Sequence, residues 1–530
     1  MREDATRRQR LAWVALSLVV ALSGLLCVFL GDFWRDESWY YAGSWLTIHG
    51  SLPHVDFFVH HDPLLFYVYG AVQGLAGPSL LVGRIESWVF WLASVLLLAR
   101  LAWKLGGAGA ATLFLVLVAT NPFATRYFVT FTWRPLELFL MSLALTVVAS
   151  ERPKGGRYAT VALLLALVVG LRFPIDLSTA LLALFLGYVG IRFRHERRLV
   201  VASFAAAGVV LVVLVLPYVW RAPDQYLFDV VRFPLGMASY LRSRGLLTEW
   251  SGPVTSFFSA VRLFGSELRF FFASVALFLA VMAYRIAELR SRGTAGWRQW
   301  CLERGEWWWL TVAYVLIGEA LATASRQGTP VTRIVSFMLG SLLVSVECAR
   351  LFRAASPEMR RALAAAIGVV VCLSPFLQDL NSPGVRARWA SSDVFLLRKA
   401  AATVRASTTP DKAILTFDPA LATEADRRIG LDMIMEVWSV FPGWSTDVCT
   451  RYHLTNIPML LGAIDGRRVG AIVLSTPGRL DDDAGIGAEL RPYRAAIREA
   501  IGSGYRVVAS VSGPREGRAE PVLVDVYVPK

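Results

Sequence analysis

"LAWVALSLVVALSGLLCVFLGDFWRDESWYY" occupies residues 11–41 and joins a long apolar run to a charged, aromatic segment. The run contains about 20 residues, which is enough to cross a hydrocarbon core of about 30 Å as a helix. The basic residues before it are also typical of a secretion signal, but no cleavage site of small residues follows. We therefore predict a retained first membrane helix with a cytoplasmic N-terminus.

The composition indicates that the rest of the chain is membrane-embedded too. Of 530 residues, 55% are hydrophobic and 18% are charged, whereas soluble proteins have about 25% charged residues. The net charge of +14 fits basic cytoplasmic loops, and no basic helix or RNA-binding motif indicates nucleic-acid binding. The five cysteines are scattered and form no C-x-x-C motif, so the sequence indicates neither a disulfide framework nor a zinc site.

Further apolar runs of spanning length predict about eleven transmembrane helices. They lie near residues 11–31, 80–103, 108–128, 133–150, 158–175, 176–192, 198–219, 263–284, 306–324, 333–350 and 361–377. The segments predicted to be cytoplasmic all carry basic residues, as in "RFRHERR" and "ARLFRAASPEMRR", which is what the positive-inside rule requires. An odd number of spans places the C-terminus outside the cytoplasm.

Two regions are predicted from this count. Residues 1–377 form a transmembrane region with a first outer loop at 32–79 and a second long outer loop at 220–262, and residues 378–530 form a small extracytoplasmic α/β domain. In the first loop, "DESWYYAGSWLTIHG" and "PLLFYVYGAVQGLAG" are helical in pattern but short, so we expect interfacial helices. The C-terminal segments "KAILTF", "VGAIVLS", "YRVVASVS" and "PVLVDVYV" are typical of strands.

Asp36 and Glu37 follow directly after the first apolar run. One interpretation is structural, with Asp36 capping the helix that begins there. The other is catalytic, with a carboxylate just outside the bilayer acting as general base. A base at this depth would suit a reaction in which one reactant is a lipid head group.

A second polar group lies in "VDFFVHHDPLL" at residues 55–65. Three readings of this group stay open: it is a polar loop before a helix that starts at Pro63, it orients a phosphate, or it binds a divalent metal together with Asp36. The candidate ligands of that metal are Asp36, His60, His61 and Asp62, and the candidate phosphate-binding residues are Asp56, His60 and His61.

Arginines near the predicted outer helix ends form a third group. The positive-inside rule makes such residues scarce, and charge close to the membrane is costly and usually functional. A guanidinium is permanently charged and binds phosphate through two hydrogen bonds. The candidate phosphate ligands are Arg126, Arg134, Arg172 and Arg333.

The first outer loop resembles that of the GT-C glycosyltransferases, the polyprenyl-phosphate-sugar-dependent group that includes aminoarabinose transferases and protein O-mannosyltransferases. The resemblance rests on Asp36, Glu37, Tyr40, Gly50, Pro53, Asp56, Phe57, Phe58, His60, Pro63 and Leu64, and more weakly on "NPFATRYFVTFTWRPLELFLMSLAL". The chain has His61-Asp62-Pro63 where the family usually has Lys-Pro-Pro, and Arg134 where many members have an acidic residue.

The resemblance implies a GT-C-like fold and an inverting transfer of a sugar from a polyprenyl-phosphate donor to an acceptor hydroxyl, with Asp36 as the base. The acceptor is a lipid, a glycan or a protein, no cofactor is required by the pattern, and a divalent metal is one option. We expect an integral protein of the cell (inner) membrane. The alternatives are a transporter or flippase of lipid-linked sugars, although no repeated halves are visible, and a non-catalytic scaffold.

Overall fold

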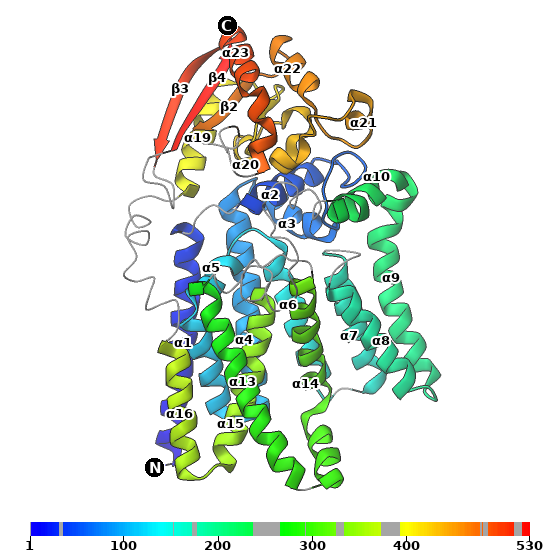
Figure 1. Ribbon diagram of the computed structural model, residues 1–530, viewed down its shortest axis with the longest axis vertical. Helices are drawn as coiled ribbons and strands as arrows, with labels where there is room; N and C mark the ends of the chain where they lie inside the picture. The colour runs from blue at the N-terminus through cyan, green and yellow to red at the C-terminus, as the bar shows by residue number, and fades with distance from the viewer. Residues whose placement is uncertain are drawn as a thin grey trace.

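The computed structural model has a bundle of long helices and a C-terminal region that covers one end of it (Figure 1). We call that end the capped end. The structure describes residues 2–30, 35–151, 153–171, 177–236, 265–291, 293–324, 333–372, 393–476, 480, 486–513 and 522–530. The N-terminus lies at the opposite end of the bundle from the C-terminus.

The bundle helices overlap the predicted apolar segments, although the segments 80–103 and 108–128 fall mainly within one bent helix, α4. They are α1 (Arg2–Leu30), α4 (Leu80–Ala119), α5 (Pro122–Phe128), α6 (Trp133–Val148), α7 (Lys154–Val169), α8 (Leu177–Arg192), α9 (Arg197–Arg221), α13 (Gly265–Ser291), α14 (Gly293–Ala324), α15 (Ile334–Ala354) and α16 (Pro357–Cys372). Within the described residues, the helices long and apolar enough to span a bilayer are Leu11–Leu30, Leu80–Ala119, Arg197–Arg221 and Ile334–Ala354. The chain is therefore an integral membrane protein, while the number of eleven crossings stays a prediction.

Two glycines break the longest helices. Gly107 in α4 has φ 77° and ψ −174°, and Gly305 in α14 has φ 68° and ψ 176°. Side chains with a Cβ rarely adopt positive φ, so glycine is the residue that permits these bends. The bend at Gly107 falls between the predicted segments 80–103 and 108–128, and the bend at Gly305 separates a polar start of α14 from its apolar part.

Small residues allow α1 and α4 to approach closely, as is common in membrane bundles. Trp91 of α4 is fully buried. A Cβ added at Gly24 would lie 2.4 Å from Cζ3 of Trp91 and 2.9 Å from Cδ1 of Trp88. The contact between the two helices therefore has no room for a side chain at position 24 of α1.

We expect Gly24→Val to lower the melting temperature of the purified protein, because overpacking typically costs about 1–3 kcal/mol. Gly208→Val is the matched control, since a Cβ at Gly208 on α9 meets no atom within 4 Å. Fluorescence-detected thermal unfolding in detergent measures both. Equal melting temperatures for the two variants would contradict the close contact.

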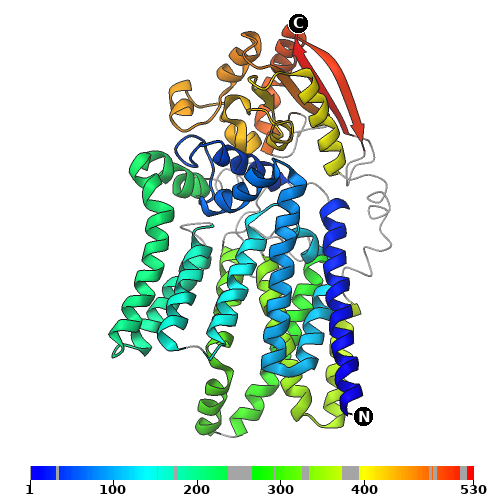
Figure 2. The same ribbon diagram turned by 180° about the vertical axis from the view of Figure 1, so that it is seen from behind.

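Both short helices predicted in the first loop are present at the capped end, between the bundle and the C-terminal region (Figure 2). They are α2 (Arg35–Ile48) and α3 (Leu64–Ala76). Gly50, just past α2, has φ 92°, and Gly77, at the end of α3, has φ 86°, so a glycine follows each helix at a positive-φ position. The described part of the second predicted loop is also helical, with α10 (Pro223–Leu227) and a π-helical turn η1 (Phe228–Arg232).

The C-terminal region contains the four predicted strands in one mixed sheet. β1 (Ile414–Thr416), β2 (Ala471–Thr476), β3 (Tyr505–Gly513) and β4 (Val522–Pro529) have the order β1-β2-β4-β3. Among these four strands, β1 and β2 pair in parallel, and the pairs β2–β4 and β3–β4 are antiparallel. The helical elements around them are α19 (Asp393–Ser407), α20 (Pro419–Glu424), η3 (Gly430–Ser439), α21 (Thr446–Arg451), α22 (Ile457–Asp465), η5 (Ile486–Tyr493) and α23 (Arg494–Gly504).

Candidate active site

Asp36 lies in the first turn of α2 and is half-buried. Successive residues of an α-helix are about 100° apart around its axis, so Trp39 and Tyr40 project from the same side of α2 as Asp36. Ser38, Tyr41 and Trp45 project from the other side. We call the first side the Asp36 face and describe its neighbours first.

The histidine pair of the first loop packs against the Asp36 face. The Tyr40 hydroxyl and Nε2 of His61 are 2.8 Å apart in a hydrogen bond. The ring centroids of Trp39 and His60 are 6.0 Å apart, and those of His60 and His61 are 4.1 Å apart. The structure therefore brings His60 and His61 to the side of α2 that carries Asp36, although they are more than 20 residues away in sequence.

Glu37 has a different environment from its neighbour Asp36. Its side chain is fully buried and forms a two-point ion pair with Arg84 of α4, with distances of 2.8 Å from Nε to Oε1 and 2.5 Å from Nη2 to Oε2. The backbone N–H of Phe131 also donates to Oε1 at 2.7 Å. Both carboxylate oxygens are thus engaged, which favours an anchoring role for Glu37, and its predicted part in catalysis stays a prediction.

The remaining carboxylates of the first loop lie in separate places. Asp56 is exposed, and its Oδ2 accepts from the backbone N–H of Leu52 at 2.7 Å, which closes a turn. Asp62 is buried and accepts from the Tyr226 hydroxyl at 3.3 Å. Neither carboxylate lies on α2: Asp56 bonds within the first loop, and Asp62 bonds to Tyr226 of α10.

The predicted metal set of Asp36, His60, His61 and Asp62 does not assemble. Among the residues that the structure describes, no three His, Cys, Asp or Glu side chains are grouped closely enough to hold a metal ion. The physical reason is that neighbouring residues of the loop bond to different partners: His60 contacts Sδ of Met435 through Nδ1 at 3.3 Å, whereas His61 bonds to Tyr40. We therefore assign no metal to these residues, and the predicted metal set stays a prediction.

Three of the four predicted arginines lie in described parts of the chain. Arg126 is half-buried in the last turn of α5, and Arg134 is buried at the start of α6, with its guanidinium 4.8 Å from the ring centre of Trp133. Arg333 precedes α15 and donates from Nε to Oε2 of Glu319 at 2.8 Å. Arg172 lies outside the described residues.

A buried histidine–aspartate cluster joins the first loop to η1 and was not predicted. Nδ1 of His54 is 3.0 Å from Oδ2 of Asp229, and both side chains are fully buried. Asp229 also accepts from Nε2 of Gln225 at 2.6 Å and from the backbone N–H of Val59 at 3.4 Å. Burial lowers the pKa of His54 to about 3 and raises the pKa of Asp229 well above its usual value, so this environment favours uncharged side chains.

A second set of unpredicted contacts joins α2 to the C-terminal region. Ser38 donates to Oδ1 of Asp418 at 2.7 Å, Tyr41 donates to Oε2 of Glu424 at 3.0 Å, and Trp45 donates to Oδ1 of Asp426 at 3.3 Å. The donors recur every three or four residues, which is the period of one helix face. That period was readable in the sequence, but the acceptors, about 380 residues away, carry no local signal.

The arrangement of a helical bundle, two short helices at its capped end and a C-terminal α/β region is the fold of the GT-C glycosyltransferases. ArnT from Cupriavidus metallidurans in the apo state has a TM-score of 0.60 and 13% identity to this chain, and the match covers 98% of each chain. ArnT bound to undecaprenyl phosphate has a TM-score of 0.57 and 12% identity, over 97% of this chain and 98% of that one.

An archaeal enzyme has the same fold over a smaller share of its length. The oligosaccharyltransferase from Archaeoglobus fulgidus, in complex with zinc and sulfate, has a TM-score of 0.51 and 13% identity, over 93% of this chain and 71% of that one. No family model matches the sequence, and no curated protein matches it. At these identities the likeness establishes the fold, and it confirms the GT-C resemblance of the first loop at that level.

Proposed function

We propose that this protein is a membrane glycosyltransferase that transfers a sugar from a polyprenyl-phosphate donor to an acceptor hydroxyl. The observation that carries the proposal is the likeness to ArnT across 98% of both chains. The complex of that protein with undecaprenyl phosphate supports a polyprenyl-phosphate donor for this chain. The acceptor is a hydroxyl of a lipid, a glycan or a protein.

In the proposed reaction the Asp36 carboxylate removes the proton of the acceptor hydroxyl. The acceptor oxygen then bonds to the anomeric carbon from the side opposite the phosphate. The bond from that carbon to the phosphate oxygen breaks, the configuration inverts, and the polyprenyl phosphate leaves with the electron pair. The proton stays on Asp36 until water accepts it, so the step requires Asp36 within hydrogen-bond reach of the hydroxyl.

The leaving phosphate gains negative charge in the transition state, and cations already in place would stabilise it. Arg333 is the best supported of the predicted arginines for this role. Its Nε is held by Glu319, whereas its Nη1 is buried and has no hydrogen-bond partner among the described residues. A buried donor of this kind is costly unless a ligand accepts from it. Arg126, Arg134, Arg172, His60 and His61 remain further candidates for binding the phosphate, and Asp56 remains a candidate for binding the substrate.

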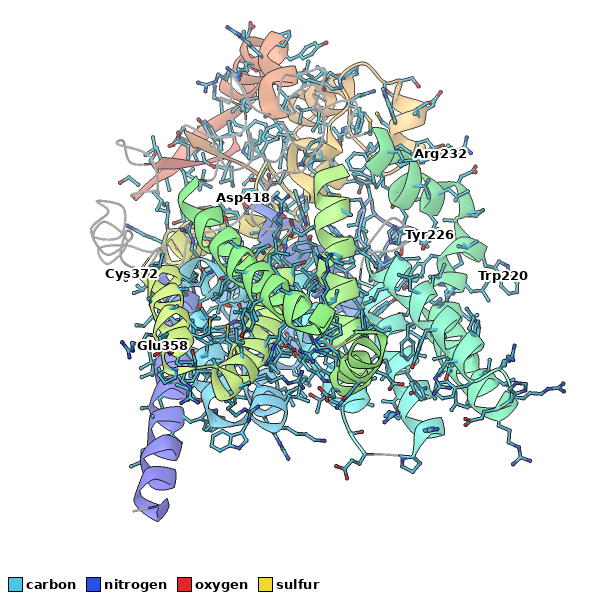
Figure 3. The ribbon with its side chains drawn as sticks, turned by 60° about the horizontal axis from the view of Figure 1, so that its bottom comes forward. Trp220, Tyr226, Arg232, Glu358, Cys372 and Asp418 are labelled. Atoms are coloured by element: carbon cyan, nitrogen blue, oxygen red, sulfur yellow. The ribbon has the colours of Figure 1, made fainter. Side chains whose placement is uncertain are left out.

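We further propose that the capped end faces away from the cytoplasm in the cell (inner) membrane. Basic segments such as residues 192–198 lie at the other end of the bundle, where the positive-inside rule expects them. At the capped end, Trp220 in the last turn of α9 is 81% exposed and points away from the bundle (Figure 3). An exposed tryptophan at a helix end is typical of the membrane–water interface.

Asp36→Asn tests the proposal directly. The full chain is reconstituted in vesicles with a panel of undecaprenyl-phosphate sugars and with envelope lipids, glycans and peptides as acceptors. Released undecaprenyl phosphate is measured with and without a chelator. We expect the variant to lose about 10²–10³ or more of the transfer rate, because it removes the base, while its melting temperature stays close to that of the parent.

The matched control is Asp447→Asn, which makes the same chemical change at an exposed position on α21. The control should transfer at the parent rate. If Asp36→Asn releases undecaprenyl phosphate as fast as the parent, Asp36 is not the base. If the parent transfers no sugar from any donor of the panel, the glycosyltransferase proposal is wrong for these donors.

A further inference from the structure

The C-terminal region contacts α2 through three acidic side chains, Asp418, Glu424 and Asp426. Asp418 accepts a hydrogen bond from Ser38, Glu424 accepts one from Tyr41, and Asp426 accepts one from Trp45. Asp418 lies at the boundary between the bundle and the C-terminal region (Figure 3). The Ser38 hydroxyl also accepts from the backbone N–H of Ala420 at 2.9 Å. One face of α2 is therefore bonded along its length to the C-terminal region.

Glu424 connects more elements than its two neighbours do. Its Oε2 accepts both from the Tyr41 hydroxyl and from the backbone N–H of Leu80 at 2.9 Å. Leu80 is the first residue of α4, so a carboxylate of the C-terminal region satisfies one of the free N–H groups at that helix start. Oε1 lies 3.6 Å from Nε of Arg398 on α19. The side chain is buried and joins α2, α4 and α19.

These contacts fix α2 from the side opposite Asp36. On an α-helix, residues 38, 41 and 45 lie about 140–200° around the axis from residue 36. Between these two sides Glu37 bonds to Arg84, one turn into α4. The start of α4 thus holds α2 twice, through Arg84 directly and through Leu80 by way of Glu424. The Asp36 face is the remaining side of the helix.

We propose that the C-terminal region positions the catalytic helix, and that Glu424 is a positioning residue that acts on Asp36 through α2. This inference rests on the function proposed above. Glu424 does not itself meet the reacting atoms, because it bonds to the face of α2 turned away from Asp36. Its part is to keep Asp36 at the distance and angle that proton transfer needs, and a displacement of about 1 Å can lower a rate about 10²-fold.

The test compares Glu424→Ala with Glu424→Gln in the reconstituted full chain. We expect Glu424→Ala to lower kcat per folded protein about tenfold to hundredfold, with the donor KM within about threefold of the parent, because donor contacts are untouched. Glu424→Gln keeps an oxygen that can accept from Tyr41 and Leu80, so it should recover most of kcat. A role in folding alone would lower the melting temperature and leave kcat per folded protein unchanged.

Ser38→Ala with Tyr41→Phe is the second variant, and it serves if Glu424→Ala does not fold. It removes three hydrogen bonds from the same contact and leaves Glu424 in place, so it should lower kcat in the same way. Glu499→Ala is the control, since Glu499 is exposed on α23.

The proposed function and this inference fail in different ways. If Asp36→Asn retains full transfer, the proposed function fails. If Asp36→Asn is inactive while the double variant and Glu424→Ala keep the parent kcat, only the positioning role is overturned. An equal loss of kcat in Glu499→Ala, or a Glu424→Gln variant as slow as Glu424→Ala, would overturn it as well.

Discussion

Arg84→Met should destabilise the protein by about 3–5 kcal/mol, because it leaves a buried carboxylate without its partner. Arg84 and Glu37 are each at most 1% exposed, so both charges of the pair are buried. The same arginine donates from Nη1 to the carbonyl oxygen of Val28 at the end of α1, at 3.3 Å. The variant therefore loses contacts to both α1 and α2, and we expect a large drop in melting temperature in detergent.

A double variant separates the ion pair from simple loss of packing. Glu37→Gln in addition to Arg84→Met removes the unpaired charge but keeps an oxygen for the N–H of Phe131, so it should recover part of the lost stability. Arg100→Met, at an exposed position on α4, is the control and should change little. A drop below about 1 kcal/mol for Arg84→Met, the range of surface pairs, would contradict this account.

Asp229→Ala should have the second largest effect, because one buried side chain is hydrogen-bonded to three buried groups. The substitution leaves His54, Gln225 and the N–H of Val59 without this acceptor, and each unsatisfied buried group costs about 1–3 kcal/mol. These donors join the first loop to η1. We therefore expect a lower melting temperature and also faster proteolytic cleavage between residues 54 and 62.

The control for Asp229 lies one turn away. Asp224→Ala removes a carboxylate that is 56% exposed and pairs with Arg451 at the surface, and such pairs contribute about 0–1 kcal/mol. Thermal unfolding and limited proteolysis in detergent are run on both variants. If Asp229→Ala melts and is cleaved like Asp224→Ala, the cluster does not hold the first loop.

The sequence predicted those features that depend on local pattern. Apolar length identified the bundle segments, short apolar segments indicated the four strands, and Gly50 marked the end of the first short helix of the loop, because these signals act over a few residues. The first-loop motif pointed to the GT-C fold for the same reason: it lies within about 30 residues.

The side-chain partners were not predictable, because they depend on contacts between distant segments. Asp36 and Glu37 are adjacent acidic residues, and the sequence alone does not distinguish their roles. The packing of α4 against α2 places Arg84 beside Glu37. The metal hypothesis stays a prediction, because the positions of its ligands depend on the same kind of contact. His60 and His61 lie together beside α2, but His60 contacts Met435 of η3 and His61 bonds to Tyr40 of α2, and neither partner was readable from the sequence.

The face of α2 that is hydrogen-bonded to the C-terminal region limits how segments of this protein can be exchanged with those of its structural relatives. A chimaera joined near residue 392 would combine a foreign C-terminal module with a native α2, and its acceptors would not meet Ser38, Tyr41 and Trp45. Exchange of the module together with residues 35–48 would keep that interface intact. The C-terminal region and α2 should therefore be exchanged between relatives as one unit.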